Sequence, residues 1–194
     1  MNTNSKFIIT INRELGSGGR TVGRKLAEKL GVPYHDKTLI QALQERYNLT
    51  AEQIEQLKGH EISWWESFKQ KMTEDVFRAE TQILKALAKD QSCVIAGRTA
   101  FYMFRDHPNH LSVFIHASML NRMERVAREQ DMSKEQARLV IDKVDKMREN
   151  YVNEFAGTSR YDARNYHLVL NMDELSEDAA VDLILQYIRS SAQG

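Results

Sequence analysis

Short runs of β-branched and apolar residues alternate along the chain with segments of helical periodicity. Five such runs are predicted to be strands: residues 7–11, 32–35, 93–96, 111–115 and 166–171. The first run is almost continuously apolar, which is typical of a strand covered on both faces of a parallel sheet, so we place it at the centre. Because helical segments separate the runs, the pattern predicts an α/β fold with a five-stranded parallel sheet.

Between these strands, apolar residues recur at steps of three and four, which is the periodicity of amphipathic helices. Thr21 begins the first helix and Gly31 ends it. Ser118 starts a basic helix, and Ser133 with Gln136 forms a capping box for the next one. The positions expected to face inward are Val140, Val144, Met147 and Tyr151 in the helix after Ser133, and Ala180, Leu183, Ile184 and Ile188 in the last helix, which Ser176 caps.

The chain has 194 residues, a length that suits one well-buried domain. The stretch from Lys37 to Gln91 reads as a helical insertion, with a capping box at Thr50 and Gln53 and an apolar stripe from Ile62 to Leu87. No low-complexity tract or proline-rich linker interrupts the sequence. We therefore expect a single domain over residues 1–194 that contains this insertion.

Charge and cysteine content narrow the class of protein. Lysine plus arginine and aspartate plus glutamate each total 27, so no global field favours nucleic acid or an anionic membrane. The single cysteine, Cys93, cannot form an internal disulfide, and it falls in a predicted strand, where an inert core residue is expected. No signal sequence opens the chain, and no apolar stretch approaches the roughly 20 residues of a membrane helix. These features predict a cytoplasmic protein with local anion-binding sites.

A glycine-rich turn, RELGSGGRT, joins the first predicted strand to the first predicted helix. Such a turn exposes successive backbone N–H groups at a helix N-terminus, where the helix dipole favours a phosphate. Gly16, Gly18 and Gly19 allow close approach, Arg20 adds charge, and Thr21 offers a hydroxyl to a magnesium ion. The pattern GxxxxGK[ST] is not met, because no lysine follows the glycines. A plain strand-to-helix turn is the alternative interpretation.

Arginines gather at two further places. Arg98 follows the third predicted strand, at the sheet edge where ligands of parallel sheets bind, and its fork could hold a phosphate. A surface salt bridge is the alternative. The second place is a pair of successive predicted helices, which carry Arg122, Arg125, Arg128, Arg138 and Arg148. The alternative interpretation is that these arginines form a solvated helix face with i,i+4 ion pairs.

Other candidate sites are less specific. The six histidines show no metal-ligand spacing, so a transition-metal site is not expected. Trp64 and Trp65 could line a base pocket, although at least one of them belongs to an apolar helix stripe, which favours core packing. Asp36 could cap a helix, bind a ligand, or do both.

The order of these segments resembles the cytidylate kinase-like family, relatives of bacterial cytidylate kinases among the P-loop nucleoside monophosphate kinases. The segments INRELGSGGR, PYHDKTLI, VIAGR and YHLVLNMDELSEDAA carry the resemblance over nearly the whole chain. It implies a three-layer P-loop sandwich with a monophosphate-binding insertion at about residues 37–91 and a helical lid at about residues 118–157. It also implies ATP as phosphoryl donor, Mg²⁺ as cofactor and cytidylate as the default acceptor.

The resemblance further implies roles for single residues. The loop Gly16, Ser17, Gly18, Gly19, Arg20 and Thr21 would hold the ATP phosphates, with Thr21 at the metal. Asp36 would lie in the monophosphate-binding region and Arg98 would contact the acceptor phosphate. Arg122 and Arg125 would close over the transferring phosphoryl group, with Arg148 behind them.

Two departures from the resemblance bear on activity. Cytidylate kinases are similar to GPSGxGKGT in the loop, whereas this chain lacks that lysine, and Thr99 follows Arg98 where they have aspartate. Arg13 or Arg20 could replace the lysine in charge, but a planar guanidinium differs from it in shape. The leading hypothesis is a cytidylate kinase-like phosphotransferase in which Arg20, Arg122 and Arg125 stabilise the developing charge. The alternatives are a non-catalytic nucleotide-binding regulatory protein and a kinase for another small acceptor.

Overall fold

The structure is a computed structural model that describes residues 1–3, 5–36, 78, 81–82, 84–86 and 88–191. Contacts along the chain divide it into two compact units: Met1–Asp36 together with Gln91–Gly194, and Lys37–Asp90. The architecture below is that of the first unit. The expected capping box at Thr50 and most of the expected helical stripe from Ile62 to Leu87 lie outside the described residues.

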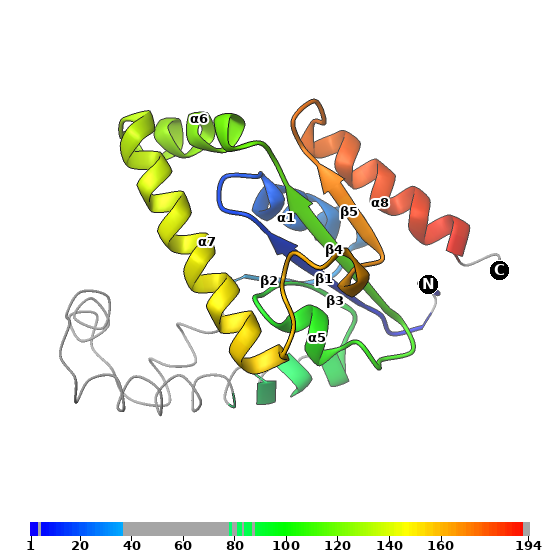
Figure 1. Cartoon of the computed structure of the whole chain (residues 1–194). Helices are drawn as coiled ribbons and strands as arrows, with labels where there is room; N and C mark the ends of the chain where they lie inside the picture. Colours follow the sequence, from blue (N-terminus) through cyan, green and yellow to red (C-terminus); the bar gives the residue numbers. More distant parts are fainter. Residues whose placement is uncertain (4, 37–77, 79–80, 83, 87, 192–194) are drawn as a thin grey trace, which may run out of the picture. The chain divides into compact units, whose positions relative to one another are not determined.

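Five parallel strands form one sheet in the order β2-β3-β1-β4-β5, as Figure 1 shows. The predicted parallel sheet is confirmed, and the first strand is its centre, between β3 and β4. Every residue of this strand except the last is buried, in keeping with its continuous apolar sequence. The strands are β1 (Ile8–Arg13), β2 (Tyr34–His35), β3 (Cys93–Ala96), β4 (His110–His116) and β5 (Leu168–Asn171).

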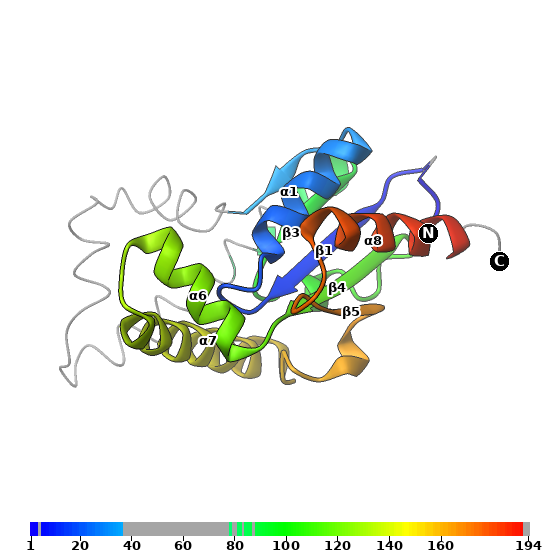
Figure 2. The ribbon, with the colours of Figure 1, turned by 90° about the horizontal axis from the view of Figure 1, so that it is seen from above.

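Helices cover both faces of the sheet, with α1 and α8 side by side on one face and α7 on the other (Figure 2). The expected caps are present: Ser118 and Ser176 each accept a backbone N–H, and Ser133 with Gln136 forms a full capping box. The helices are α1 (Gly19–Leu30), α5 (Ala100–Met103), α6 (Met119–Gln130), α7 (Lys134–Ala156) and α8 (Glu177–Ser191), with a 3₁₀ turn at Ala163–Asn165.

The two faces of the central strand differ in chemistry. Ile9 and Ile11 pack into the main core against α1 and α8, where Leu26 and Ile184 are fully buried. On the opposite face, Thr10 and Asn12 are just as buried but polar. Since buried polar groups need partners, this second face is organised by hydrogen bonds and ion pairs.

Two expected inward positions are wrong. Met147 has 55% of its surface exposed, and Leu183 has 42% exposed. In α7 the buried face runs instead through Ala137, Ile141, Asp145 and Val152. The apolar pattern misses this face because one of its members is a carboxylate, held there by ion pairs rather than by hydrophobic burial.

His110 begins β4 on the polar face of the sheet. Its Nε2 lies 2.8 Å from the Thr10 hydroxyl, while its Nδ1 is buried and has no partner among the described residues. Burial, together with the nearby His167 and His107, lowers the pKa of His110 to about 3. The imidazole is therefore neutral in the folded protein at pH values where an unfolded chain binds a proton.

This difference predicts acid sensitivity. Between about pH 6.5 and pH 3 the unfolded state binds more protons at this side chain, so the free energy of unfolding falls as pH falls. Between pH 7 and pH 4.5 the loss attributable to His110 is on the order of 2 kcal/mol. Urea unfolding followed by circular dichroism at both pH values measures it. His110→Gln should flatten the pH dependence. Equal slopes for the variant and the parent protein would contradict the assignment.

Candidate functional site

The glycine-rich turn links the carboxyl end of β1 to the start of α1, at the centre of the sheet. Gly16 and Gly18 both have φ of +82°, a left-handed conformation that side chains rarely adopt. A Cβ at Gly16 would also lie 2.8 Å from the Arg122 carbonyl oxygen of α6. The glycines are therefore required by backbone shape and by close packing under α6.

The start of α1 has no side-chain cap. Within the described chain its N-cap, Gly18, offers no side-chain acceptor, and its first turn has no acidic residue. The first N–H groups of a helix have no intrahelical partner, so they remain available to an external acceptor. Together with the helix dipole, they make this turn suitable for an anion.

A cavity of about 250 Å³ opens in front of this turn. Its wall combines the turn with side chains from β1, α1, α6 and α7, and each of these four elements contributes one arginine. The predicted loop residues Gly16, Gly18, Gly19, Arg20 and Thr21 thus lie together at one cavity, joined by Arg125. The lining residues are Arg13, Glu14, Leu15, Gly16, Gly18, Gly19, Arg20, Thr21, Arg125, Glu129, Gln130 and Arg148.

A second cavity of about 240 Å³ also adjoins the turn. Gly16 and Arg125 line both cavities, so the two spaces meet at the turn. Arg125 is placed there by an ion pair with Glu177 at the start of α8, at 2.8 Å. The remaining lining residues are Ser17, Ala117, Asn121, Glu124, Arg128, Met172 and Asp173.

Asp145 of α7 is the carboxylate around which this region is arranged. It accepts a hydrogen bond from the backbone N–H of Leu15 in the turn at 3.1 Å. Its other oxygen is 2.5 Å from Arg122 Nη1 of α6. Arg148 and Arg160 complete the group at 3.7 and 3.4 Å. One buried carboxylate thus fixes the turn, α6, α7 and the segment after α7.

Arg160 is a member of the site that the sequence analysis missed. Its side chain is fully buried, donating to the Arg13 carbonyl and, at 3.3 Å, to Asn12 Oδ1. Its guanidinium also lies over the rings of Phe114 and Tyr161. No periodicity or motif marks this position, because it follows the end of α7 in an irregular segment.

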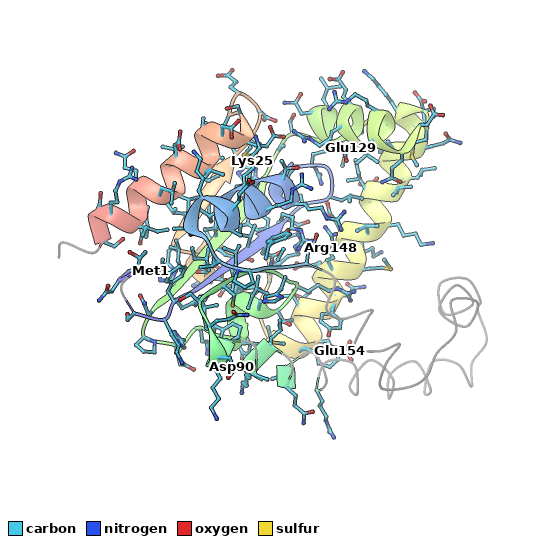
Figure 3. The ribbon with its side chains drawn as sticks, turned by 180° about the vertical axis from the view of Figure 1, so that it is seen from behind. Met1, Lys25, Asp90, Glu129, Arg148 and Glu154 are labelled. Carbon is cyan, nitrogen blue, oxygen red and sulfur yellow. The ribbon has the colours of Figure 1, made fainter. Side chains whose placement is uncertain are left out.

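Arg148 faces the turn from α7, as Figure 3 shows, and donates to the Arg13 carbonyl at 3.3 Å. Burial lowers the pKa of Arg148 to about 10, and the positive charges of Arg13 and Arg160 add to the effect. A guanidinium still carries its charge at neutral pH. A cation buried beside other cations favours an anion nearby.

Asp36, just after β2, lies between two arginines. Arg13 Nη2 donates to one of its oxygens at 2.5 Å, and Arg20 Nε donates to the other. The pKa of Arg20 is raised by its hydrogen bond to Asp36. The predicted acceptor residue Asp36 is therefore next to the loop in this structure.

Two predicted residues are engaged elsewhere. Arg122 is 6% exposed and is paired with Asp145 and, at 3.4 Å, with Glu14. These ion pairs hold the turn in place. Arg98 stacks its guanidinium over Tyr151 of α7 at 4.8 Å. Neither is among the residues that line the two cavities. Their contacts with phosphate remain predictions.

The described residues contain no group of three or more histidine, cysteine or acidic side chains placed to hold a metal ion. In the same part of the chain, no helix has the length and apolar character needed to cross a membrane.

Comparison with known proteins decides the family. The model of the cytidylate kinase-like family matches residues 8–174. The chain belongs to that family. A cytidylate kinase of Pyrococcus horikoshii is 26% identical over 180 residues, which cover 92% of this chain and 86% of that protein. A shikimate kinase of Actinobacillus succinogenes is 27% identical over 121 residues, or 59% of this chain and 60% of that protein.

Solved structures give the same fold. A protein from Eubacterium ventriosum, described as uncharacterized, has a TM-score of 0.76 at 28% identity and covers 95% of this chain and 99% of that one. A shikimate kinase from Acinetobacter baumannii, solved in complex with shikimate, has a TM-score of 0.58 at 20% identity over 98% of both chains, a likeness of fold alone. The predicted P-loop α/β fold and the family resemblance are both confirmed. The kinase-like relatives support a phosphotransferase.

The Asp145 group predicts a large difference between two neighbouring carboxylates. Asp145→Asn removes the charge that offsets buried Arg122 and Arg160, so we expect a loss of about 3–5 kcal/mol in the free energy of unfolding. Asp142→Asn, one turn earlier and 57% exposed, breaks only a surface pair with Arg138 and should cost less than about 1 kcal/mol. Urea titration of both variants measures the difference. Similar losses would show that Asp145 does not hold the region together.

Proposed function

We propose that the protein is an ATP-dependent nucleoside monophosphate kinase, with cytidylate as the first acceptor to test. One observation carries the proposal: the uncapped start of α1 opens into a cavity lined by four arginines. Phosphoryl transfer is catalysed mainly by positioning and by stabilising charge, and this arrangement can do both. Membership of the cytidylate kinase-like family and the cytidylate kinase relative support the choice of acceptor.

The donor phosphates would lie against the backbone from Gly16 to Thr21, in the first cavity. Arg125 reaches both cavities, so the nucleoside part of the donor would occupy the second one, beside Asn121 and Asp173. The left-handed glycines let phosphate oxygens approach the backbone closely.

Magnesium, when bound, would neutralise part of the charge of the donor phosphates. Thr21 is the hydroxyl residue at the cavity that we propose to hold it. Mg²⁺ keeps several waters and uses few protein ligands when phosphates are present. The residues at the site therefore fit this ion, although they form no three-ligand cluster in the described chain.

On the acceptor side we propose Arg98 and Asp36. Arg98 stands one residue beyond Gly97 at the carboxyl end of β3, the edge at which parallel sheets bind ligands. Its guanidinium offers two parallel donors to one phosphate or carboxylate. We propose that the transferring group is stabilised by Arg20, Arg122 and Arg125. For this contact, Arg122 would leave its ion pair with Asp145 and bind phosphate instead.

A kinase for a different small acceptor is favoured by one finding, the similarity to shikimate kinases over part of the chain. A non-catalytic nucleotide-binding protein is the other alternative, because the loop lysine is absent. Both alternatives keep the donor site and differ in turnover or in acceptor.

A panel of acceptors separates these functions. Purified protein with ATP and Mg²⁺ is given CMP, dCMP, UMP, AMP, GMP or shikimate, and ADP release is measured. We expect turnover with CMP above all others, because the family resemblance points to cytidylate. Turnover with shikimate alone would move the assignment to the other kinase class. ATP binding by calorimetry without turnover on any acceptor would favour the regulatory protein.

Arg98→Lys tests the acceptor contact. The lysine keeps the charge but loses the paired donors, so the KM for the acceptor should rise by about tenfold or more while the KM for ATP changes little. Arg105→Lys is the matched control, because Arg105 also stacks on a tyrosine, Tyr102 at 3.9 Å, and is exposed. An unchanged acceptor KM in Arg98→Lys would assign that residue to structure.

A further inference from the structure

The turn differs from the loop pattern at several positions, and two of them touch each other in space. Against GPSGxGKGT, Arg13 stands at the first glycine and Gly19 stands at the lysine, while Gly16, Gly18 and Thr21 match. A Cβ at Gly19 would lie 2.6 Å from Arg13 Cβ and 3.1 Å from Arg13 Cγ. The side chain of Arg13 therefore crosses the space from which a lysine at position 19 would start.

The Arg13 side chain also lies at the cavity in which a loop lysine would contact the donor phosphates. It lines the 250 Å³ cavity together with Gly18, Gly19 and Thr21, at the uncapped start of α1. Its side chain is only 16% exposed, so a charge there is poorly screened by solvent.

Asp36 orients the guanidinium of Arg13 but does not occupy all of its N–H donors. In the described part of the chain, Nη2 alone of its side-chain nitrogens donates to a protein group, the Asp36 carboxylate at 2.5 Å. Among the described residues, Nη1 and Nε have no hydrogen-bond acceptor, so both can donate to an external one. An ion pair that is 9% exposed on the aspartate side holds the fork in one orientation and so lowers the entropy lost when an anion binds.

We propose that Arg13 takes the place of the missing loop lysine: glycine and cation have exchanged positions at the two ends of the turn, and Arg13 contacts the donor phosphates across Gly19. Asp36 is the positioning residue for this contact. The inference rests on the proposed function, since it needs a phosphate donor in the cavity. Under this proposal, the absence of the loop lysine does not imply that the activity has been lost.

A double-mutant cycle tests the exchange, with the dissociation constant of MgATP from calorimetry as readout. Arg13→Gly removes the cation and should weaken binding by about tenfold or more. Gly19→Lys places its Cβ against Arg13 and should weaken binding and lower the melting temperature. The double variant R13G/G19K has the usual arrangement and should bind MgATP more tightly than either single variant. No recovery in a folded double variant would overturn the proposal.

A second pair of variants tests the proposal in case the double variant does not fold. Arg13→Gln keeps a long side chain without the charge and should weaken MgATP binding by about tenfold, while leaving adenosine binding unchanged. Arg24→Gln, on the exposed side of α1, makes the same charge change away from the cavity and should leave both unchanged. Parent-like MgATP binding by Arg13→Gln would overturn the inference. A parent protein that binds no MgATP would instead refute the proposed function.

Discussion

The buried carboxylate of Asp145 is the interaction on which the region around the glycine-rich turn depends. It joins the turn, through Leu15, to three successive parts of the chain that are distant from the turn in sequence: α6 through Arg122, α7 itself, and the segment after α7 through Arg160. A buried ion pair is costly to desolvate and becomes favourable only when each group finds several partners. Here one carboxylate has four donors within 3.7 Å, so its negative charge is shared and the turn keeps a single shape.

The same region has more positive than negative groups near the turn. Asp36 and Asp145 offset part of the charge of Arg13, Arg20 and Arg148. Burial shields Arg13 and Arg148 from water, whereas Arg20 is exposed. In such a site the positive groups are already in place before a negative charge arrives. This preorganisation is the basis of electrostatic stabilisation in phosphoryl transfer. The absence of one lysine in a sequence pattern therefore says little about the total positive charge at the cavity.

The sequence predicted the fold well because its signals are local. The strand runs, the caps at Ser118 and Ser133 and the glycine turn depend on neighbouring residues, and all of them are present in the structure. The buried face of α7 was not predictable from apolar periodicity, because Asp145 belongs to it. Arg160 was missed for the same reason: its burial is compensated by partners on β1 and α7, and no local pattern encodes such partners.

The length of α7 has a mechanical consequence. Its 23 residues form a rod of about 35 Å. Near one end, Ala137 and Ile141 pack with α6 and Leu15 of the turn. Near the other end, Val152 and Ala156 pack on Phe101 of α5, and Tyr151 supports the guanidinium of Arg98. The glycine-rich turn and Arg98 are therefore both in contact with one helix, so a rotation of α7 about its axis that follows a change at the turn also shifts the tyrosine ring under Arg98.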